Sequence, residues 1–280
     1  MTVGVVHAVA DLRAAIAAFR AKGERVALVP TMGALHAGHL SLVEAARREA
    51  ARVVATVFVN PTQFGPCEDF AKYPRTLPQD LEKLASVKTD LCFAPSIDDM
   101  YPQGFATRVE MDGPARAGLE DRFRPTHFCG VATVVTKLLN QAQADCAIFG
   151  EKDYQQLLVI KRLAQDLDIA TKILSGPTLR EKDGLAMSSR NVYLSAEERR
   201  IAPALHASLS EAAQKIASGE PIDATLDAAR KKLADAGFAI DYLEARHAET
   251  LAPVTGEDPI RLLVAAKLGS VRLIDNLAVK

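Results

Sequence analysis

The sequence lacks an excess of charge of either sign. Its 280 residues include 34 lysines and arginines and 35 aspartates and glutamates, which gives a formal net charge of −1 at pH 7. Proteins that bind nucleic acid usually carry a net or clustered surplus of basic residues, because their partner is a polyanion. The composition therefore gives no reason to expect a nucleic-acid partner.

Long hydrophobic runs are also missing. No apolar stretch approaches the length of about 20 residues with which a helix crosses a bilayer, so we expect no membrane association. The first residues, MTVGVVHAVADLR, do not combine a basic segment, an apolar segment and a small-residue cleavage site, so we expect no secretory signal. These features predict a cytoplasmic protein.

Cysteine is sparse and has no recognisable pattern. No pair has the C-x-x-C spacing that is typical of zinc sites and redox motifs. Reduced thiols in the cytoplasm fit this distribution better than a disulfide framework does. The four cysteines are Cys67, Cys92, Cys129 and Cys146.

What the sequence does contain is a succession of short apolar runs that alternate with helical patterns. The run RVVATVFV at residues 52–59 is apolar on both faces, as in a central strand of a parallel sheet with helices on both sides. The alternation predicts an α/β fold built on a parallel sheet. Further strands are expected at residues 26–29, 90–94, 106–111, 146–149 and 169–174.

The composition changes after about residue 178, where a turn-rich segment leads into helices rich in alanine and charged residues. Helices are expected at residues 196–218 and 223–236, and strands at 240–247 and 260–274. We therefore predict two domains, an α/β domain over residues 1–178 and a smaller α+β domain over residues 179–280.

The stretch PTMGALHAGH, residues 30–39, lies between a predicted strand and a helix expected over residues 40–52. The N-terminus of a helix favours anionic groups, and imidazole donates hydrogen bonds to phosphate oxygens. His36 and His39 also have the spacing of a metal pair or of two solvated side chains. The strand before them and the helix after them favour a nucleotide site, and no further ligand lies nearby at a familiar metal-site spacing.

A second polar loop follows the run at residues 52–59. Ligands of open α/β sheets bind outside the carboxyl ends of the strands, so Asn60 and Gln63 are expected at the same edge as the histidines. Their amides suit the hydroxyl and carboxylate groups of a small substrate. A turn held by asparagine and proline is an equally good interpretation of this loop alone.

A third loop, GEKD at residues 150–153, follows the strand predicted at 146–149. Lys152 suits a phosphate group as a point charge, although a solvated surface lysine is the safer interpretation of this residue alone. Asp153 fits best as the N-cap of the next helix, and it alternatively accepts a hydrogen bond from a ribose hydroxyl. Gln156, one turn further on, is placed near the same edge.

Two cationic segments are weaker candidates for anion binding. Residues 187–190, MSSR, offer two hydroxyls and a guanidinium, which together suit a triphosphate but are common on protein surfaces. Arg116, Arg122 and Arg124 lie in a polar loop, where such side chains are usually solvated or screen an anionic site.

Six segments, in this order and at compatible spacings, resemble the family of pantothenate synthetases, also called pantoate–β-alanine ligases. Each segment alone is a weak signal, whereas six in order are specific. Two positions depart from the family pattern, Ala37 inside H-x-G-H and Thr126 where glycine is common, and neither departure touches a side chain that is assigned to chemistry. The segments are PTMGALHAGH, FVNPTQF, EDFAKYPR, RPTHFCGVATVVTKLLN, FGEKDYQQL and DGLAMSSRNVYLS.

The resemblance implies a Rossmann-like domain of the nucleotidylyltransferase type and a smaller C-terminal domain that closes over the site as a lid. It implies that ATP and pantoate form an enzyme-bound pantoyl adenylate and pyrophosphate. The amine of β-alanine then attacks the activated carbonyl to give pantothenate and AMP. Mg²⁺ is implied with the ATP, and the enzyme is implied to be a homodimer.

The resemblance also assigns roles to individual residues. His36 and His39 are implied to stabilise the phosphates, with His39 as proton donor, and Lys152 to bind phosphate. Gln63 and Gln156 are implied to bind pantoate, with Asn60 beside them. The implied ATP-binding residues are Met32, Gly33, Ala34, Leu35, His36, Ala37, Gly38, His39, Gly150, Glu151, Lys152, Asp153, Leu179, Met187, Ser188, Ser189 and Arg190.

Some assignments stay open at this level. Tyr73, Arg124 and His127 match residues near the family's site without a defined role, and Asp80 is a conceivable neighbour of the metal. The alternative functions are a nucleotidylyltransferase that retains the nucleotidyl group on its product, a non-catalytic nucleotide sensor, and an α/β protein without a nucleotide.

Overall fold

The computed structural model describes residues 2–66 and 68–280, and the chain forms two compact units. One unit comprises Met1–Glu151 and Gln156–Pro177, and the other comprises Lys152–Gln155 and Thr178–Lys280. Cys92, Cys129 and Cys146 are free thiols, and the prediction for Cys67 lies outside the described residues.

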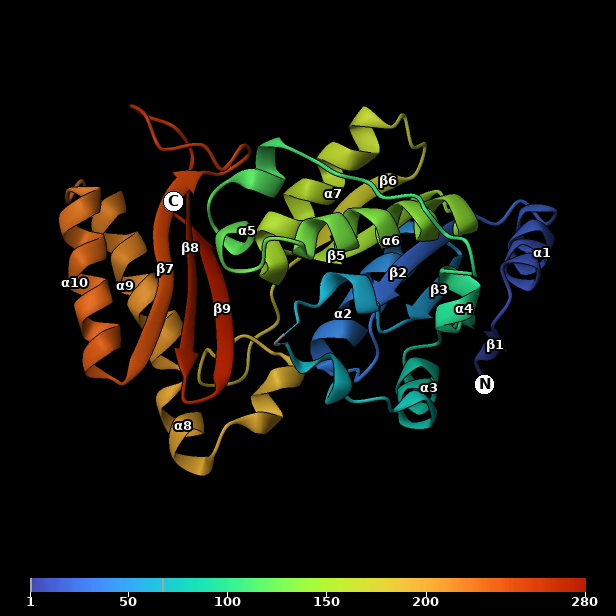
Figure 1. The fold of residues 1–280 in the computed structure, drawn as a ribbon, viewed down its shortest axis with the longest axis horizontal. Helices are drawn as coiled ribbons and strands as arrows, with labels where there is room; N and C mark the ends of the chain where they lie inside the picture. The colour runs from blue at the N-terminus through green and yellow to red at the C-terminus, as the bar shows by residue number, and fades with distance from the viewer. Residues whose placement is uncertain (1, 67) are drawn as a thin grey trace. The chain divides into compact units, whose positions relative to one another are not determined.

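The first unit is built on a six-stranded sheet in the order β1-β4-β3-β2-β5-β6, in which every neighbouring pair is parallel (Figure 1). The chain places β3 and β4 on one side of β2 and then returns to place β5 and β6 on the other side. The strand order therefore reverses beside β2, which is where open α/β sheets bind ligands. The strands are β1 (Gly4–Val6), β2 (Val26–Thr31), β3 (Arg52–Val57), β4 (Leu91–Phe93), β5 (Cys146–Gly150) and β6 (Lys172–Gly176).

Helices cover both faces of this sheet, so the central strands are largely buried and mostly apolar. On one face, α2 and α3 pack on a cluster that includes Val43, Val53 and Leu84. On the other face, α1, α6 and α7 pack on a cluster that includes Leu12 and Val131. The longer helices are α1 (Val9–Arg20), α2 (Ala37–Glu49), α3 (Leu77–Ser86), α6 (His127–Ala142) and α7 (Tyr154–Asp166), and the short ones are α4 (Ile97–Met100) and α5 (Glu120–Phe123).

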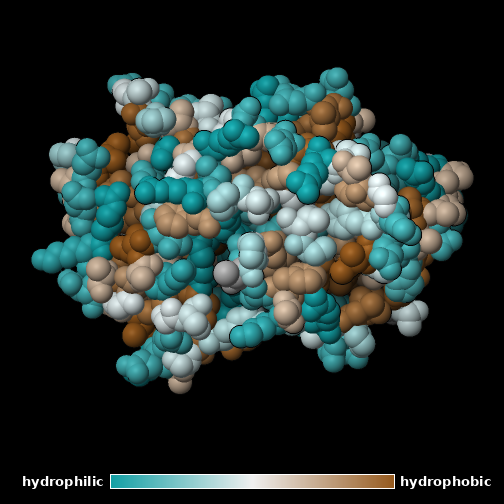
Figure 2. Space-filling view, viewed as in Figure 1, coloured by the Kyte–Doolittle hydropathy of each residue, from teal (hydrophilic) through white to brown (hydrophobic). Residues whose placement is uncertain are grey.

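The second unit is a three-stranded antiparallel sheet in the order β7-β8-β9, with α9 and α10 packed on it. Hydrophilic side chains cover much of the face drawn in Figure 2, where hydrophobic side chains form smaller groups. The elements are α8 (Ala196–Ile201), α9 (Ala204–Ala217), α10 (Ile222–Asp235), β7 (Phe238–His247), β8 (Ile260–Leu268) and β9 (Val271–Ala278).

The predicted α/β class, with a smaller α+β part after it, is confirmed, but four predicted elements were wrong in extent or kind. The single helix expected at residues 196–218 is two helices, because Pro203 interrupts the pattern. The strand expected at 260–274 is a hairpin that turns at Gly269, where φ is +56°. Residues 106–111 form no strand. The helix expected at 40–52 begins at Ala37 and ends at Glu49.

The loop after β3 lies against the backbone of α6. Gly130 allows this approach, because a Cβ atom there would lie 2.3 Å from the carbonyl oxygen of Thr62 and 2.6 Å from Cα of Gln63. The short helix Pro61–Gln63 is thus held against α6 by main-chain contact.

We expect Gly130→Ala to lower the free energy of unfolding by about 1–3 kcal/mol, because the added methyl group meets backbone atoms that cannot rotate away. Denaturant unfolding measures the effect. Gly65→Ala is the matched control, since its Cβ would meet only the flexible Glu68 side chain, at 3.4 Å, and should change stability by less than about 0.5 kcal/mol. Equal stability of the two variants would contradict the close approach.

Candidate active site

The turn after β2 has an unusual backbone and is held by a buried carboxylate. Gly33 and Ala34 both have positive φ, +82° and +49°. Asp80, which is fully buried on α3, accepts hydrogen bonds from the amides of Ala34 (3.0 Å) and Leu35 (2.8 Å) and from the hydroxyl of Thr76 (3.1 Å). Asp80 therefore fixes this turn.

His36 is the N-cap of α2, and the two histidines bind each other's backbone. Nδ1 of His36 accepts from the amide of Gly38 (3.1 Å), and Nδ1 of His39 accepts from the amide of His36 (3.3 Å). An amide only donates, so each neutral ring carries its proton on Nε2. The ring centroids lie 4.1 Å apart. The site thus has two neighbouring Nε2–H donors at the start of a helix.

Most backbone amides of this turn are already used inside it. The amide of Gly33 donates to the hydroxyl of Thr31 (3.2 Å), and the amide of His39 donates to the carbonyl of His36 (2.9 Å). Together with the bonds to Asp80 and to the ring nitrogens, this leaves side chains rather than amides as the main donors for an anion at this edge. The sequence had suggested free helix amides in that role.

Asn60 is the centre of the second loop and is 1% exposed. Its side-chain nitrogen donates to Oε1 of Gln63 (3.1 Å) and to the carbonyl of Gly130 (3.2 Å), and its oxygen accepts from the hydroxyl of Tyr101 (2.7 Å). The Gln63 amide is therefore oriented with its nitrogen toward the turn after β2, where it lies 3.1 Å from the sulfur of Met32. The structure thus brings two of the predicted loops together.

His127 supports the backbone of Gln63 from α6. Nε2 of His127 lies 3.2 Å from a guanidinium nitrogen of Arg124, which only donates, so Nδ1 carries the proton and donates to the carbonyl of Gln63 (3.0 Å). Burial and the positive charge of Arg124 lower the pKa of His127 to about 4. His127 is therefore neutral at pH 7.

Arg124 is held by acidic side chains rather than solvated. Its guanidinium donates two hydrogen bonds of 2.8 Å to Glu68 and lies 3.5 Å from Glu120. Burial raises the pKa of Glu68, but the hydrogen bonds and charge of Arg124 outweigh burial and leave this pKa below its usual value. Arg124 and His127 thus hold the backbone of Gln63 in place.

Tyr73 is buried, and its ring packs on that of Phe64 in a T-shaped arrangement with the centroids 5.9 Å apart.

In the second unit, residues 179–187 form a tight hairpin that leads to the MSSR segment. The amide of Met187 donates to the carbonyl of Leu179 (3.0 Å), and the backbones of Arg180 and Ala186 pair as an isolated antiparallel β-bridge. The hydroxyl of Ser188 accepts from the amide of Arg190 (3.2 Å) and caps the short helix Ser189–Tyr193. The segment therefore has a defined conformation.

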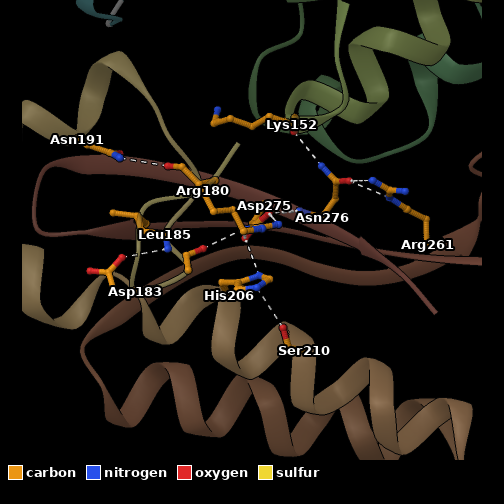
Figure 3. A network of polar contacts seen from close by, with 12 residues as sticks. Lys152, Arg180, Asp183, Leu185, Asn191, His206, Ser210, Arg261, Asp275 and Asn276 are labelled. Carbon is orange, nitrogen blue, oxygen red and sulfur yellow. Dashed lines mark hydrogen bonds and ion pairs between the residues drawn. The ribbon is translucent and has the colours of Figure 1, made fainter. Parts of the chain in front are cut away.

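Lys152 also belongs to the second unit. Its carbonyl accepts a hydrogen bond from the side chain of Asn276, at 2.9 Å (Figure 3). Its ammonium lies 4.0 Å from a carboxylate oxygen of Asp153. Gly150 and Glu151 belong to the first unit and lie at the carboxyl end of β5, next to β2. Gln156 is partly buried in α7 of the first unit.

Several residues that organise these segments were missed by the sequence analysis, namely Tyr101, Arg180, Asp275 and Asn276. Tyr101, Asp275 and Asn276 lie far along the chain from the segments that they contact, and the Asp275 partner of Arg180 is 95 residues away, so no local pattern reveals these contacts. Asp80 lies in the first turn of α3, which begins at Leu77. Recognising that this helix begins there would have placed Asp80 on a packed element. Among residues 2–66 and 68–280, no three metal-ligating side chains gather, and no helix is long and apolar enough to cross a membrane.

The fold and this polar edge define an α/β protein of the Rossmann-like type, with its polar side chains where the strand order reverses. A family model described as pantoate-beta-alanine ligase matches residues 4–278. Pantothenate synthetases of Rhodopseudomonas palustris (strain HaA2) and Nitrobacter hamburgensis are 60% and 56% identical over 270 and 271 residues. These alignments cover 96% of this chain in both cases, and 95% and 96% of the two relatives.

Solved structures show the same relationship. Pantothenate synthetase from Thermus thermophilus has a TM-score of 0.93 at 49% identity, and 99% of each chain is covered. Pantoate-beta-alanine ligase from Francisella tularensis, complexed with beta-gamma ATP and beta-alanine, has a TM-score of 0.84 at 35% identity, with 99% of this chain and 97% of that chain covered. The chain belongs to the pantoate–β-alanine ligase family and is a ligase, which confirms the predicted family.

The low pKa of His127 predicts a pH-dependent stability. The unfolded chain takes up this proton near pH 6.5, whereas the folded chain does so near pH 4. The unfolded state therefore binds more protons between these values, and the contribution of His127 falls by up to about 3 kcal/mol as pH drops through this window. We expect the His127→Asn variant to lose less stability than the unaltered protein between about pH 7 and about pH 5 in denaturant titrations. The same pH dependence in both proteins would contradict the assignment.

Proposed function

We propose that this enzyme joins pantoate and β-alanine to form pantothenate through an enzyme-bound pantoyl adenylate, with release of pyrophosphate and AMP. The observation that carries the proposal is the pair of Nε2–H donors of His36 and His39 at the N-terminus of α2, beside the strand-order reversal. The complex of the Francisella tularensis relative with beta-gamma ATP and beta-alanine supports the same nucleotide and amine substrates.

In the proposed first step, a carboxylate oxygen of pantoate attacks the α-phosphorus of ATP. The bond from that phosphorus to the oxygen that bridges the α- and β-phosphates breaks, and the oxygen leaves with pyrophosphate. Negative charge builds on the phosphate oxygens in this transition state, so fixed hydrogen-bond donors lower the barrier. His36 and His39 supply such donors, with His39 as the proton donor.

In the proposed second step, the neutral amine of β-alanine attacks the carbonyl carbon of the adenylate. A C–N bond forms, the bond from the carbonyl carbon to the phosphate oxygen breaks, and AMP leaves while the amine loses a proton. No covalent bond to the enzyme is required. Catalysis then rests on holding the reacting groups close together and in line.

The proposed ATP-binding residues are those predicted from the sequence. Lys152 binds phosphate, Asp153 lies near the ribose, and residues 187–190 contribute hydroxyls and a guanidinium. Mg²⁺ is proposed to arrive as the ATP complex, since Mg²⁺ usually keeps its waters and is bound largely by substrate phosphates. Asp80 is engaged with the turn after β2, so its proposed role is structural.

Pantoate is proposed to bind Gln63 and Gln156, with Asn60 as the side chain that orients Gln63. The fixed orientation of the Gln63 amide supports this role, since its nitrogen is presented as a donor on the side of Met32. In the domain division predicted from the sequence, we further propose that residues 1–178 bind ATP and pantoate and that residues 179–280 act as a lid. We also propose that the enzyme is a cytoplasmic homodimer.

The decisive experiment follows pyrophosphate and AMP release from ATP, Mg²⁺ and pantoate, with and without β-alanine. We expect AMP turnover only with both substrates, and exchange of labelled pyrophosphate into ATP with pantoate alone. Retention of the adenylyl group on a stable product would favour a nucleotidylyltransferase instead. ATP binding without any response to pantoate would favour a sensor.

We expect His36→Ala and His39→Ala each to raise the barrier to adenylate formation by roughly 3 kcal/mol, or about 100-fold in rate, because each removes one transition-state donor. Single-turnover kinetics with ATP and pantoate isolate this step. Rates close to those of the unaltered enzyme would exclude a role for these rings.

Lys152→Ala should weaken both the rate and the use of ATP, because it removes a phosphate-binding charge. The dependence of the initial rate on ATP concentration measures both effects. An unchanged ATP dependence would show that Lys152 is only a surface charge.

A further inference from the structure

Strand β9 carries two consecutive buried polar residues, Asp275 and Asn276, each 3% exposed. Neighbouring residues of a strand point to opposite faces of the sheet. The two side chains accordingly reach different parts of the second unit (Figure 3). Buried polar groups of this kind need specific partners, because their desolvation is costly.

Asp275 holds the hairpin that leads to residues 187–190. Its carboxylate accepts two hydrogen bonds from the guanidinium of Arg180, at 2.7 and 2.9 Å, and Arg180 also donates to the carbonyl of Gly184 in the hairpin turn (3.1 Å). His206 of α9 lies beneath that turn, with Nδ1 3.4 Å from Asp275. A Cβ atom on Gly184 would come within 2.9 Å of the His206 ring.

The charge on Asp275 is compensated within this cluster. Burial raises the pKa of Asp275, but hydrogen bonding to His206 and Arg180 and the charge of Arg180 outweigh it, so this pKa lies below its usual value. The bidentate geometry fixes both the position and the plane of the guanidinium. Arg180 thereby connects the hairpin to β9 with a fixed guanidinium orientation.

Asn276 holds the backbone of Lys152 on the other face. Its Oδ1 accepts from Nε of Arg261 (2.8 Å), so its nitrogen is directed to the carbonyl of Lys152 (2.9 Å). The guanidinium of Arg261 also stacks on the ring of Tyr154, 4.0 Å from its centroid. The segment 152–155 is thus held by β9 through Asn276 and by β8 through Arg261.

We propose that Asp275 and Asn276 are positioning residues. They fix the positions of the two phosphate-binding segments of the second unit, Lys152 and residues 187–190, relative to strand β9. The inference rests on the proposed binding of ATP by those segments. Neither residue touches substrate in this assignment. Each acts through a backbone segment, so the effect of replacing it should appear in the use of ATP rather than in that of the other substrates.

The test measures KM for ATP, KM for pantoate and pantoate-dependent pyrophosphate exchange in the variants Asn276→Asp and Asp275→Asn of the full-length enzyme. Asn276→Asp keeps the acceptor for Arg261 but places an oxygen against the Lys152 carbonyl. We expect KM for ATP to rise about tenfold or more in each variant, the size of one lost hydrogen bond to a buried or charged group. KM for pantoate should stay within about twofold.

Asp241→Asn is the matched control, because Asp241 also makes a partly buried ion pair with a residue of β9, Arg272, at 2.7 Å. It contacts neither of the two phosphate-binding segments through that pair. We expect it to lower the melting temperature without raising KM for ATP. If Asp275→Asn fails to fold, Arg180→Lys replaces it, since lysine keeps the charge but not the two-pronged contact.

A double-mutant cycle separates positioning from general stability. If Asn276 acts through Lys152, Asn276→Asp should change KM for ATP by less than about twofold in a Lys152→Ala background, because the two effects are then not additive. Full additivity, or an equal rise of KM for ATP in Asp241→Asn, overturns the inference. Absence of ligase activity in the unaltered enzyme would instead refute the proposed function. A normal enzyme with a defective Lys152→Ala variant and normal Asn276→Asp and Asp275→Asn variants refutes only the positioning role.

Discussion

The hydrogen bonds that Asp80 accepts from Ala34 and Leu35 are the constraint on which the first unit's site depends. A fully buried carboxylate is tolerated only when donors surround it, and these amides are among them. In return, Asp80 stabilises a turn with two consecutive positive φ angles, at Gly33 and Ala34, which an unsupported chain would seldom adopt. The direction in which the chain enters α2 follows from that turn, and so does the placement of His36 as the N-cap.

The same constraint decides which hydrogen-bond donors the proposed phosphate site would use, imidazole nitrogens rather than backbone amides. A glycine-rich loop that cradles phosphate leaves its amides unpaired, whereas the amides of Gly33, Ala34 and Leu35 are already bonded within the protein. Because Nδ1 of His36 and Nδ1 of His39 accept backbone hydrogen bonds, the rings have a fixed tautomer and orientation. Donors fixed in advance stabilise developing charge without reorganisation during the reaction.

Much of the fold could be predicted from local pattern, and the errors have identifiable physical causes. Apolar runs covered on both faces revealed β2, β3 and β5. The hairpin at Gly269 was hidden because β8 and β9 are both apolar enough to look like one strand. Within the site, the His36 and Gln63 loops were recognisable as polar residues at strand ends. Asp80 and Asn276 were not, because they act on partners 45 to 124 residues away in the chain.

Glu151 belongs to the first unit and Lys152 to the second, so one predicted phosphate-binding loop contains residues of two units. Hydrophobic packing cannot fix so short a segment, because residues 152–155 offer little apolar surface. Directional bonds do so instead: the Lys152 carbonyl is bound by Asn276, and the Tyr154 hydroxyl donates to the carbonyl of Ala248 at 2.9 Å. Hydrogen bonds specify an orientation, whereas the burial of apolar area is non-directional. The ammonium of Lys152 is therefore carried on a backbone segment that is oriented within the second unit by these hydrogen bonds and by the stacking of Arg261 on Tyr154.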